Sequence, residues 1–335
     1  MPRNTNTCPL GDRVERRRLI VAQVAVLSLS MVFLAIAPNA EVLVLASTLV
    51  GINASVAQQI VPFAAEVASP AKRGAVVGTV MSGLLCGILL SRTVGGYVGE
   101  HFGWRATFFC GAAISWMTCI LLAMTLPRRA PKTTESYTAL MRSLGTLFIQ
   151  EPALRLATAV QAMLFGSFIA FWTILSLHLE NQFHLGAEIA GLFGIVGAVG
   201  VLAAPLAGRI ADRRGPHVVI GLGAMVMALS WLIFGVWTNL VGLIVGVILL
   251  DLGEQIAIVC NQHVIYGLRP EARSRVNTIF MGGMFLGGAL GSWLAGVAWQ
   301  LGAWRGAVGL GALLAVLGFV AHRLGTRKQA VPAST

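Results

Sequence analysis

The chain has 335 residues, of which 56% are hydrophobic and only 11% are charged, and its formal net charge is +11. A soluble domain carries about 25% charged residues, so this composition excludes an ordinary soluble globular protein. Apolar stretches of about 18 residues or more recur between short polar breaks, which is typical of membrane-spanning helices and not of membrane β-barrels.

Ten candidate membrane helices follow one another along the chain. They lie at residues 19–37, 42–67, 74–98, 104–126, 153–178, 187–207, 217–237, 240–264, 275–299 and 304–323. We therefore expect an all-α integral membrane protein with about ten transmembrane helices.

The basic residues indicate how these helices are oriented. If the N-terminus is cytoplasmic, all but three of the 24 Lys and Arg residues fall on cytoplasmic breaks; Arg105 and Arg305 lie outside, and Arg92 lies within a span. By the positive-inside rule, this pattern predicts a multi-pass inner-membrane protein with both termini in the cytoplasm. The positive charge is then a topology signal with some attraction to anionic lipid, so we expect no nucleic-acid partner.

Two basic loops reveal an internal repeat. The pairs Asp12-Arg13 and Asp212-Arg213 are 200 residues apart, and the same offset aligns further landmarks along the chain. These are Pro70, Arg73, Met81, Gly83, Gly87, Gly96 and Trp104-Arg105 with Pro270, Arg273, Met281, Gly283, Gly287, Gly296 and Trp304-Arg305. The repeat predicts an N-terminal half-bundle at 1–126, a cytoplasmic linker at 127–152 and a C-terminal six-helix bundle at 153–335.

The two halves are unequal. Two spans, 153–178 and 187–207, precede the second Asp-Arg pair, whereas none precedes the first. We expect that the equivalents of these two helices are absent ahead of Met1, and a protein that naturally has ten helices is the alternative. In the linker, Tyr137, Leu140, Met141, Leu144 and Phe148 fall at helical spacing, which predicts a short helix in the cytoplasmic interface or else a solvated loop.

Two six-helix halves, each with an Asp-Arg loop between its second and third helix, resemble the major facilitator superfamily. The family's loop reads Gly-x3-Asp-Arg-x-Gly-Arg-Arg. The second copy matches it at Gly208, Asp212, Arg213 and Gly215, and the first at Asp12, Arg13, Arg16 and Arg17, with Cys8 and Glu15 in place of the glycines. The resemblance implies a cytoplasmic gating motif, in which Asp12 faces the start of helix 275–299 and Asp212 the start of helix 74–98. A charge cluster that only fixes topology is the alternative.

A second motif resembles the fifth helix of proton-coupled exporters in this family. The stretch GTVMSGLLCGILLSRTVGG supplies Gly78, Gly87, Gly95 and Gly96 at the family's spacing, while Ser91-Arg92 replaces its Gly-Pro pair. Glycines at such intervals let helices approach closely, as a rocking interface requires. Ordinary helix packing explains the glycines equally without an exporter role.

Ionisable and amide side chains at membrane depth are candidates for the transport site. Asp251 and Glu254 are three residues apart on one helix face, with Gln255 beside them, and the matching helix offers Asn53 and Gln58. Carboxyl groups in a low-dielectric site favour their protonated form, so this pair could exchange protons with the two aqueous sides. A structural ion pair or a helix cap is the alternative. Arg92 would bind an anionic group or extend to the outer interface.

These features predict a secondary active transporter that exports a small organic solute by alternating access, with a solute, protons and the bilayer as partners and a monomer as the expected state. The five cysteines and six histidines show no metal-ligand spacing and no phosphate-binding loop is present, so we expect no cofactor and no enzyme activity. The alternative is a truncated, non-transporting remnant of a twelve-helix major facilitator protein. Without its first two helices, we expect this chain alone not to catalyse coupled transport.

Overall fold

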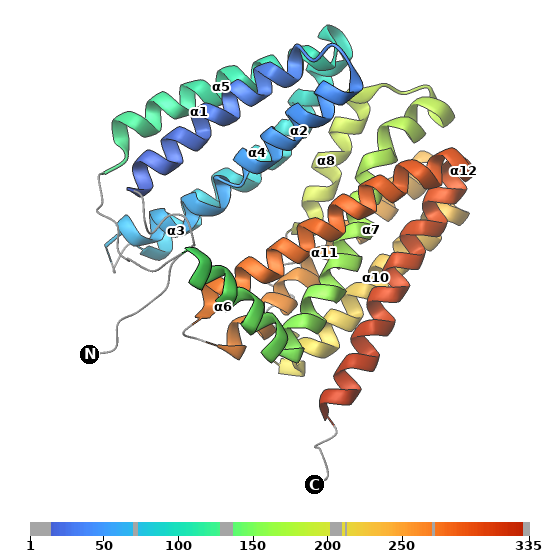
Figure 1. Ribbon diagram of the computed structural model, residues 1–335. Coiled ribbons are helices and arrows are strands. Elements are labelled where there is room, and N and C mark those ends of the chain that lie inside the picture. The colour runs from blue at the N-terminus through green and yellow to red at the C-terminus, as the bar shows by residue number, and fades with distance from the viewer. Residues whose placement is uncertain are drawn as a thin grey trace. The chain divides into compact units, whose positions relative to one another are not determined.

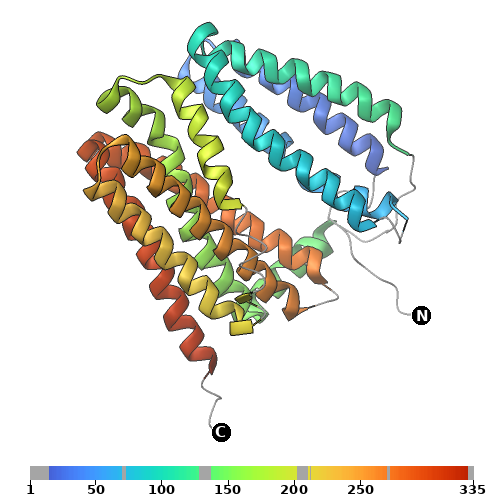
Figure 2. The same ribbon diagram turned by 180° about the vertical axis from the view of Figure 1, so that it is seen from behind.

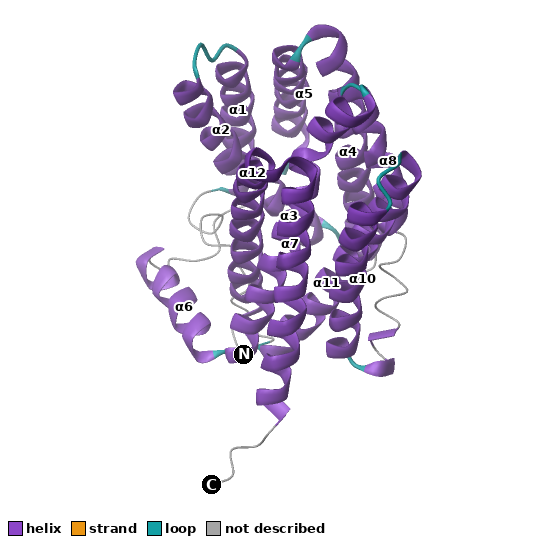
Figure 3. Cartoon of the chain, turned by 90° about the vertical axis from the view of Figure 1, so that its right-hand side faces the viewer, coloured by secondary structure: helices purple, strands orange, loops and turns teal. Residues whose placement is uncertain are grey.

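The computed structural model describes residues 15–69, 73–127, 137–201, 210–211, 213–269 and 272–330. Every regular element in these ranges is a helix (Figure 3). Eight described stretches are long and apolar enough to cross a membrane. One of them, Ala40–Val61, runs over two successive helices, and another, within α12 (Arg273–Ala330), joins two of the predicted helices. The prediction of an all-α membrane protein is confirmed.

The contacts between helices divide the chain into two compact units (Figure 1). The N-terminal unit contains α1 (Arg16–Ala35), α2 (Ala40–Ala54), α3 (Ala57–Val67), α4 (Arg73–Phe102), α5 (Trp104–Thr125) and the first five residues of α8 (Ala187–Val201). The C-terminal unit contains α6 (Tyr137–Gln150) from its second residue, α7 (Pro152–Phe183), the rest of α8, α10 (Pro216–Val236), α11 (Leu240–Leu268) and α12 (Arg273–Ala330). The linker helix α6 therefore belongs with the C-terminal unit.

Helix starts recur at the separation of 200 residues that the sequence shows. The helices α1, α2 and α4 begin at residues 16, 40 and 73, and α10, α11 and α12 begin at 216, 240 and 273. The capping residues match as well, because Asn39 and Asn239 each accept a hydrogen bond from a backbone N–H of the first turn at 2.9 Å. Asparagine is among the best residues at this position, so the same local chemistry starts the same helix twice.

Three of the predicted spans differ in detail. The helix expected at 42–67 breaks after Ala54, where Asn53 donates to the Leu49 carbonyl at 2.8 Å and Ser55 donates to the Ile52 carbonyl at 2.6 Å. Such side chains compete with the backbone and favour a helix end. Conversely, the spans expected at 275–299 and 304–323 are joined in α12 by one tight kink at Gly302 and Ala303.

The C-terminal unit is built around α7, which contacts α12 and α11. Phe171 of α7 and Trp231 and Phe234 of α10 are fully buried against one another. The indole N–H of Trp231 donates to the Ser167 hydroxyl at 2.7 Å, and that hydroxyl donates to the Gly311 carbonyl at 2.8 Å. A continuous aromatic core, in which the Trp231 N–H and the Ser167 hydroxyl are hydrogen-bonded, therefore joins α7, α10 and α12.

The N-terminal unit has a smaller core. Its helices α1 and α5 lie side by side (Figures 1 and 2), and Ser28 of α1 donates to the Ala112 carbonyl of α5 at 2.8 Å. In the most apolar stretch of α4, no described residue is buried, whereas half of the corresponding stretch of α7 is buried. The helix α4 thus carries an apolar surface that the described residues of its unit leave exposed.

Candidate polar site in the C-terminal unit

Glu254 lies in the middle of α11, a helix of 29 residues that is otherwise strongly apolar. Its side chain is buried at 4% exposure, and Gln161 of α7 donates its amide N–H to Glu254 Oε1 at 2.6 Å. Asn261, two turns further along α11, donates to Gln161 Oε1 at 2.9 Å. A buried carboxylate and two amides therefore form a hydrogen-bonded chain between α11 and α7.

Asp251 lies one turn before Glu254 and is also buried, at 8% exposure. Its carboxylate lies close to Gly197 of α8, where an added Cβ would stand 2.9 Å from Asp251 Oδ2 and 3.0 Å from Cγ. The glycine therefore gives the carboxylate room against α8. The three-residue spacing places both acidic side chains on one face of α11, as the sequence predicts.

This arrangement constrains the charge of the site. A carboxylate sealed in a low-dielectric interior is costly as an anion unless a proton or a cation neutralises it. Amide groups can donate hydrogen bonds to Glu254 but carry no charge, and Glu254 Oε2 has no hydrogen-bond partner among the described residues. The geometry is therefore suited to a carboxyl group that gains and loses a proton, or that holds a cationic group.

The chain of hydrogen bonds described above does not include the other predicted cavity residues. Gln255 is half-buried, and Asn53 bonds within its own helix. The neighbour of Gln58, Gln59, donates to Gln23 of α1 at 2.7 Å in the N-terminal unit, while the side chain of Gln58 lies outside the described residues. Arg92 is half-buried on α4. Their roles in binding stay predictions.

The glycines of the exporter-like motif fall into two groups. An added Cβ at Gly96 would stand 2.5 Å from the carbonyl oxygen of Ala187, and one at Gly95 would touch Thr107 of α5 at 3.5 Å. Around Gly78 and Gly87, in contrast, nothing described lies within 4 Å of an added Cβ. Gly96 thus allows α4 to contact the start of α8, where Glu100 also accepts a hydrogen bond from the Ala187 N–H at 2.7 Å.

Most of the predicted gating motif lies outside the described residues, namely Asp12, Arg13, Gly208 and Asp212. Of the second copy, Arg213 is exposed and Gly215 has φ +84°, a conformation that favours glycine. The predicted contacts of Asp12 and Asp212 with the opposite half therefore stay untested.

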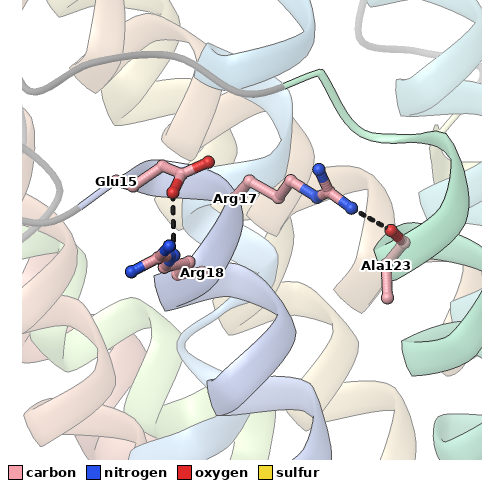
Figure 4. Close-up of polar contacts among 4 residues, drawn as sticks. All are labelled: Glu15, Arg17, Arg18 and Ala123. Carbon is pink, nitrogen blue, oxygen red and sulfur yellow. Dashed lines mark hydrogen bonds and ion pairs between the residues drawn. The ribbon is translucent and has the colours of Figure 1, made fainter.

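The last residues of the first copy of the gating motif are described, and they form contacts within the N-terminal unit. Arg17 donates to the carbonyl of Ala123 in the last turn of α5, and Arg18 pairs with Glu15 at 2.9 Å (Figure 4). A cation beside the last carbonyls of a helix is favourable, because these groups lack partners and carry partial negative charge. Arg17 therefore connects the start of α1 to the end of α5.

Sequence reasoning missed Gln161 and Asn261, which complete the site. The available signal was their residue type, since each is an amide in the interior of a strongly apolar span and therefore requires a partner. The packing of α7 against α11 supplies that partner. The sequence alone does not show which residues of these two helices face each other.

Comparisons with known proteins agree with this architecture. The family model described as Major Facilitator Superfamily matches residues 7–265 and 157–334. The chain is 38% identical to the uncharacterized transporter YgaY of Escherichia coli O157:H7, covering 96% of this chain and 82% of that protein. It is 26% identical to the multidrug resistance protein MdtG of Klebsiella pneumoniae (strain 342), over 66% of this chain and 54% of that protein.

A solved structure shows the same fold. A bacterial homolog of the human lysosomal transporter Spinster, crystallised in an inward-facing and unoccupied conformation, matches with a TM-score of 0.74 at 15% identity. The match covers 96% of this chain and 86% of that one.

Proposed function

Since the chain belongs to the major facilitator superfamily, we propose that it is a secondary transporter which exports a small organic solute in exchange for protons. The observation that carries the proton coupling is the buried bond between Glu254 and Gln161, at 2.6 Å, inside the helices of the C-terminal unit. The name of the MdtG relative, a multidrug resistance protein, supports an organic solute as the substrate class.

In this proposal, Glu254 alternates between a protonated state and a state in which its carboxylate binds the solute, and the site is electrically neutral in both. When the site is closed to one side, Glu254 holds a proton while Gln161 fixes its orientation. When a solute with a cationic group enters, the carboxyl group releases its proton and the resulting carboxylate binds that cationic group instead. Asp251 is a second carboxyl group one turn away. Because two neighbouring carboxylates repel each other, simultaneous ionisation of Asp251 and Glu254 is unfavourable. The exchange of one bound species for the other couples the two fluxes.

A flux assay tests this function. Proteoliposomes with an imposed pH gradient are loaded with fluorescent solutes of positive, zero and negative charge, and solute efflux is followed over time. We expect a gradient-dependent flux of at least one solute, a result that would contradict the sequence-based expectation that the chain alone does not catalyse coupled transport. We expect Glu254→Gln to remove the dependence of this flux on the gradient, because glutamine keeps the hydrogen bond but cannot release a proton.

Gln255→Glu serves as the matched control, because it places a new carboxyl group at the neighbouring half-buried position without restoring Glu254. In the double variant with Glu254→Gln, the gradient dependence should stay absent. The proposal is wrong if Glu254→Gln responds to the pH gradient as the parent protein does.

A further inference from the structure

The hydrogen-bonded chain between α7 and α11 has a fixed direction. A carboxylate accepts hydrogen bonds but cannot donate one, so the bond at Glu254 Oε1 requires the N–H side of the Gln161 amide, at 2.6 Å. The carbonyl oxygen of Gln161 then faces Asn261, whose amide N–H donates to it at 2.9 Å. Asn261 therefore bonds to the one end of Gln161 that Glu254 does not use.

Burial strengthens this orientation of Gln161. Its side chain is fully buried and Asn261 is 1% exposed, so bulk water does not replace either bond. If Gln161 alone turned over, its carbonyl oxygen would face Glu254 Oε1 and its N–H groups would face the N–H groups of Asn261. Both hydrogen bonds would then be lost, and buried polar groups without partners are costly. The donor at Asn261 thus keeps the N–H groups of Gln161 directed at Glu254.

The repeat indicates that helix packing alone does not require Asn261. At the separation of 200 residues, the equivalents of Glu254 and Asn261 in the N-terminal unit are the apolar residues Ala54 and Val61. Asn261 lies seven residues after Glu254 on α11, which is about 10 Å along the helix axis. At this distance its amide acts on the carboxyl group through Gln161.

The two oxygens of Glu254 have different surroundings. Oε1 accepts the N–H of Gln161, whereas Oε2 is buried and has no hydrogen-bond partner among the described residues. A carboxylic acid carries its proton on one oxygen and keeps the other as a carbonyl oxygen, which accepts hydrogen bonds. With Gln161 oriented as described, Oε1 is the carbonyl oxygen and Oε2 is the position for the proton.

We propose that Asn261 is a positioning residue for Glu254. It holds the Gln161 amide with its N–H toward Oε1, so that Oε2 is the atom that carries the proton or binds the cationic group of a solute. The inference rests on the proposed function, because it assigns the proton exchange to one oxygen of the same carboxyl group. Without Asn261, Gln161 can turn over and accept the Glu254 proton in a hydrogen bond at Oε1, and the two oxygens exchange their roles.

Infrared spectroscopy of the full chain in bilayers, in acidic buffer, tests this inference. Subtracting the spectrum of Glu254→Gln from that of the parent isolates the carbonyl band of protonated Glu254. An N–H donor on the carbonyl oxygen lowers the wavenumber of this band, so Gln161→Leu should move the band to a higher wavenumber. Asn261→Leu should add a component at that same higher wavenumber, because part of the population loses the N–H donor.

A double variant shows whether Asn261 acts through Gln161. When Asn261→Leu is combined with Gln161→Leu, the band should coincide with that of Gln161→Leu alone, because effects that pass through one residue are not additive. Ile265→Val is the matched control, since Ile265 is a fully buried residue one turn after Asn261 on α11. It loosens the packing without removing a hydrogen bond, so the band should stay at its parent position.

A single band at the parent position in Asn261→Leu would overturn the inference. So would a double variant whose band differs from that of Gln161→Leu, or an Ile265→Val band that moves as far as the band of Asn261→Leu. If Asn261→Leu lacks the helical circular dichroism of the parent, the smaller Asn261→Ala takes its place. The proposed function fails separately, when the Glu254 band does not respond to pH, whereas the position of the band in acid still tests the role of Asn261.

Discussion

The substitutions Gly287→Ala and Gly87→Ala change the same repeat position in the two units and should have opposite effects on stability. At Gly287, the new Cβ would stand 2.2 Å from the Ala162 carbonyl oxygen and 2.5 Å from its Cα. To restore ordinary contact near 3.4 Å, α7 and α12 must separate by roughly 1 Å, which weakens dispersion interactions along the whole contact between these two helices. Overpacking of this kind costs about 1–3 kcal/mol.

At Gly87 the same methyl group meets no described atom, so only the backbone effect remains. Replacing glycine by alanine within a helix stabilises it by roughly 0.5–1 kcal/mol. We therefore expect Gly287→Ala to lower the free energy of unfolding by about 1–2 kcal/mol after this gain is included, and Gly87→Ala to raise it slightly or leave it unchanged. Unfolding of each variant in mixed micelles, followed by helical circular dichroism, measures both. An equal loss of stability in the two variants would refute the packing difference between the units.

Three further sets of substitutions test other parts of the structure. Asn39→Ala and Asn239→Ala should each lower the free energy of unfolding by about 1 kcal/mol, because each removes the same capping bond, and unequal losses well beyond the error would contradict equivalent helix starts. Gln161→Leu should cost about 1–3 kcal/mol by leaving Glu254 and Asn261 unpaired. The double variant Gln161→Leu with Glu254→Leu should recover part of that loss in the same assay. The absence of any recovery would contradict an energetic coupling between Gln161 and Glu254. Gly215→Ala should cost about 1–3 kcal/mol in the same unfolding assay, because φ is +84° at this position, and a neutral result would show that the turn relaxes.

Much of the fold was predictable because its signals are local or periodic. The apolar runs define the spans, and the landmarks at a separation of 200 residues predict a repeat that the recurring helix starts of the structure share. Helix breaks depend on finer competition between side chain and backbone. For this reason the break near Asn53 and Ser55 was not predicted, although both residues are known to favour helix ends.

Of the candidate site, only the acidic residues of α11 could be predicted from the sequence. The sequence shows that Asp251 and Glu254 share a helix face, because that follows from helical periodicity. It does not show that Gln161, 93 residues earlier, lies against Glu254, because this depends on how α7 packs against α11. The two groups of glycines on α4 show the same limit, since their spacing looks alike in sequence whereas their surroundings differ.

The central claim is that Glu254 exchanges a proton within the membrane, and infrared difference spectroscopy of the reconstituted protein tests it most directly. We expect a carbonyl band of a protonated carboxyl group that changes as the external pH is varied. This band should be missing from Glu254→Gln and should persist in Glu100→Gln, which changes an exposed glutamate. A titrating band of unchanged intensity in Glu254→Gln would contradict the account.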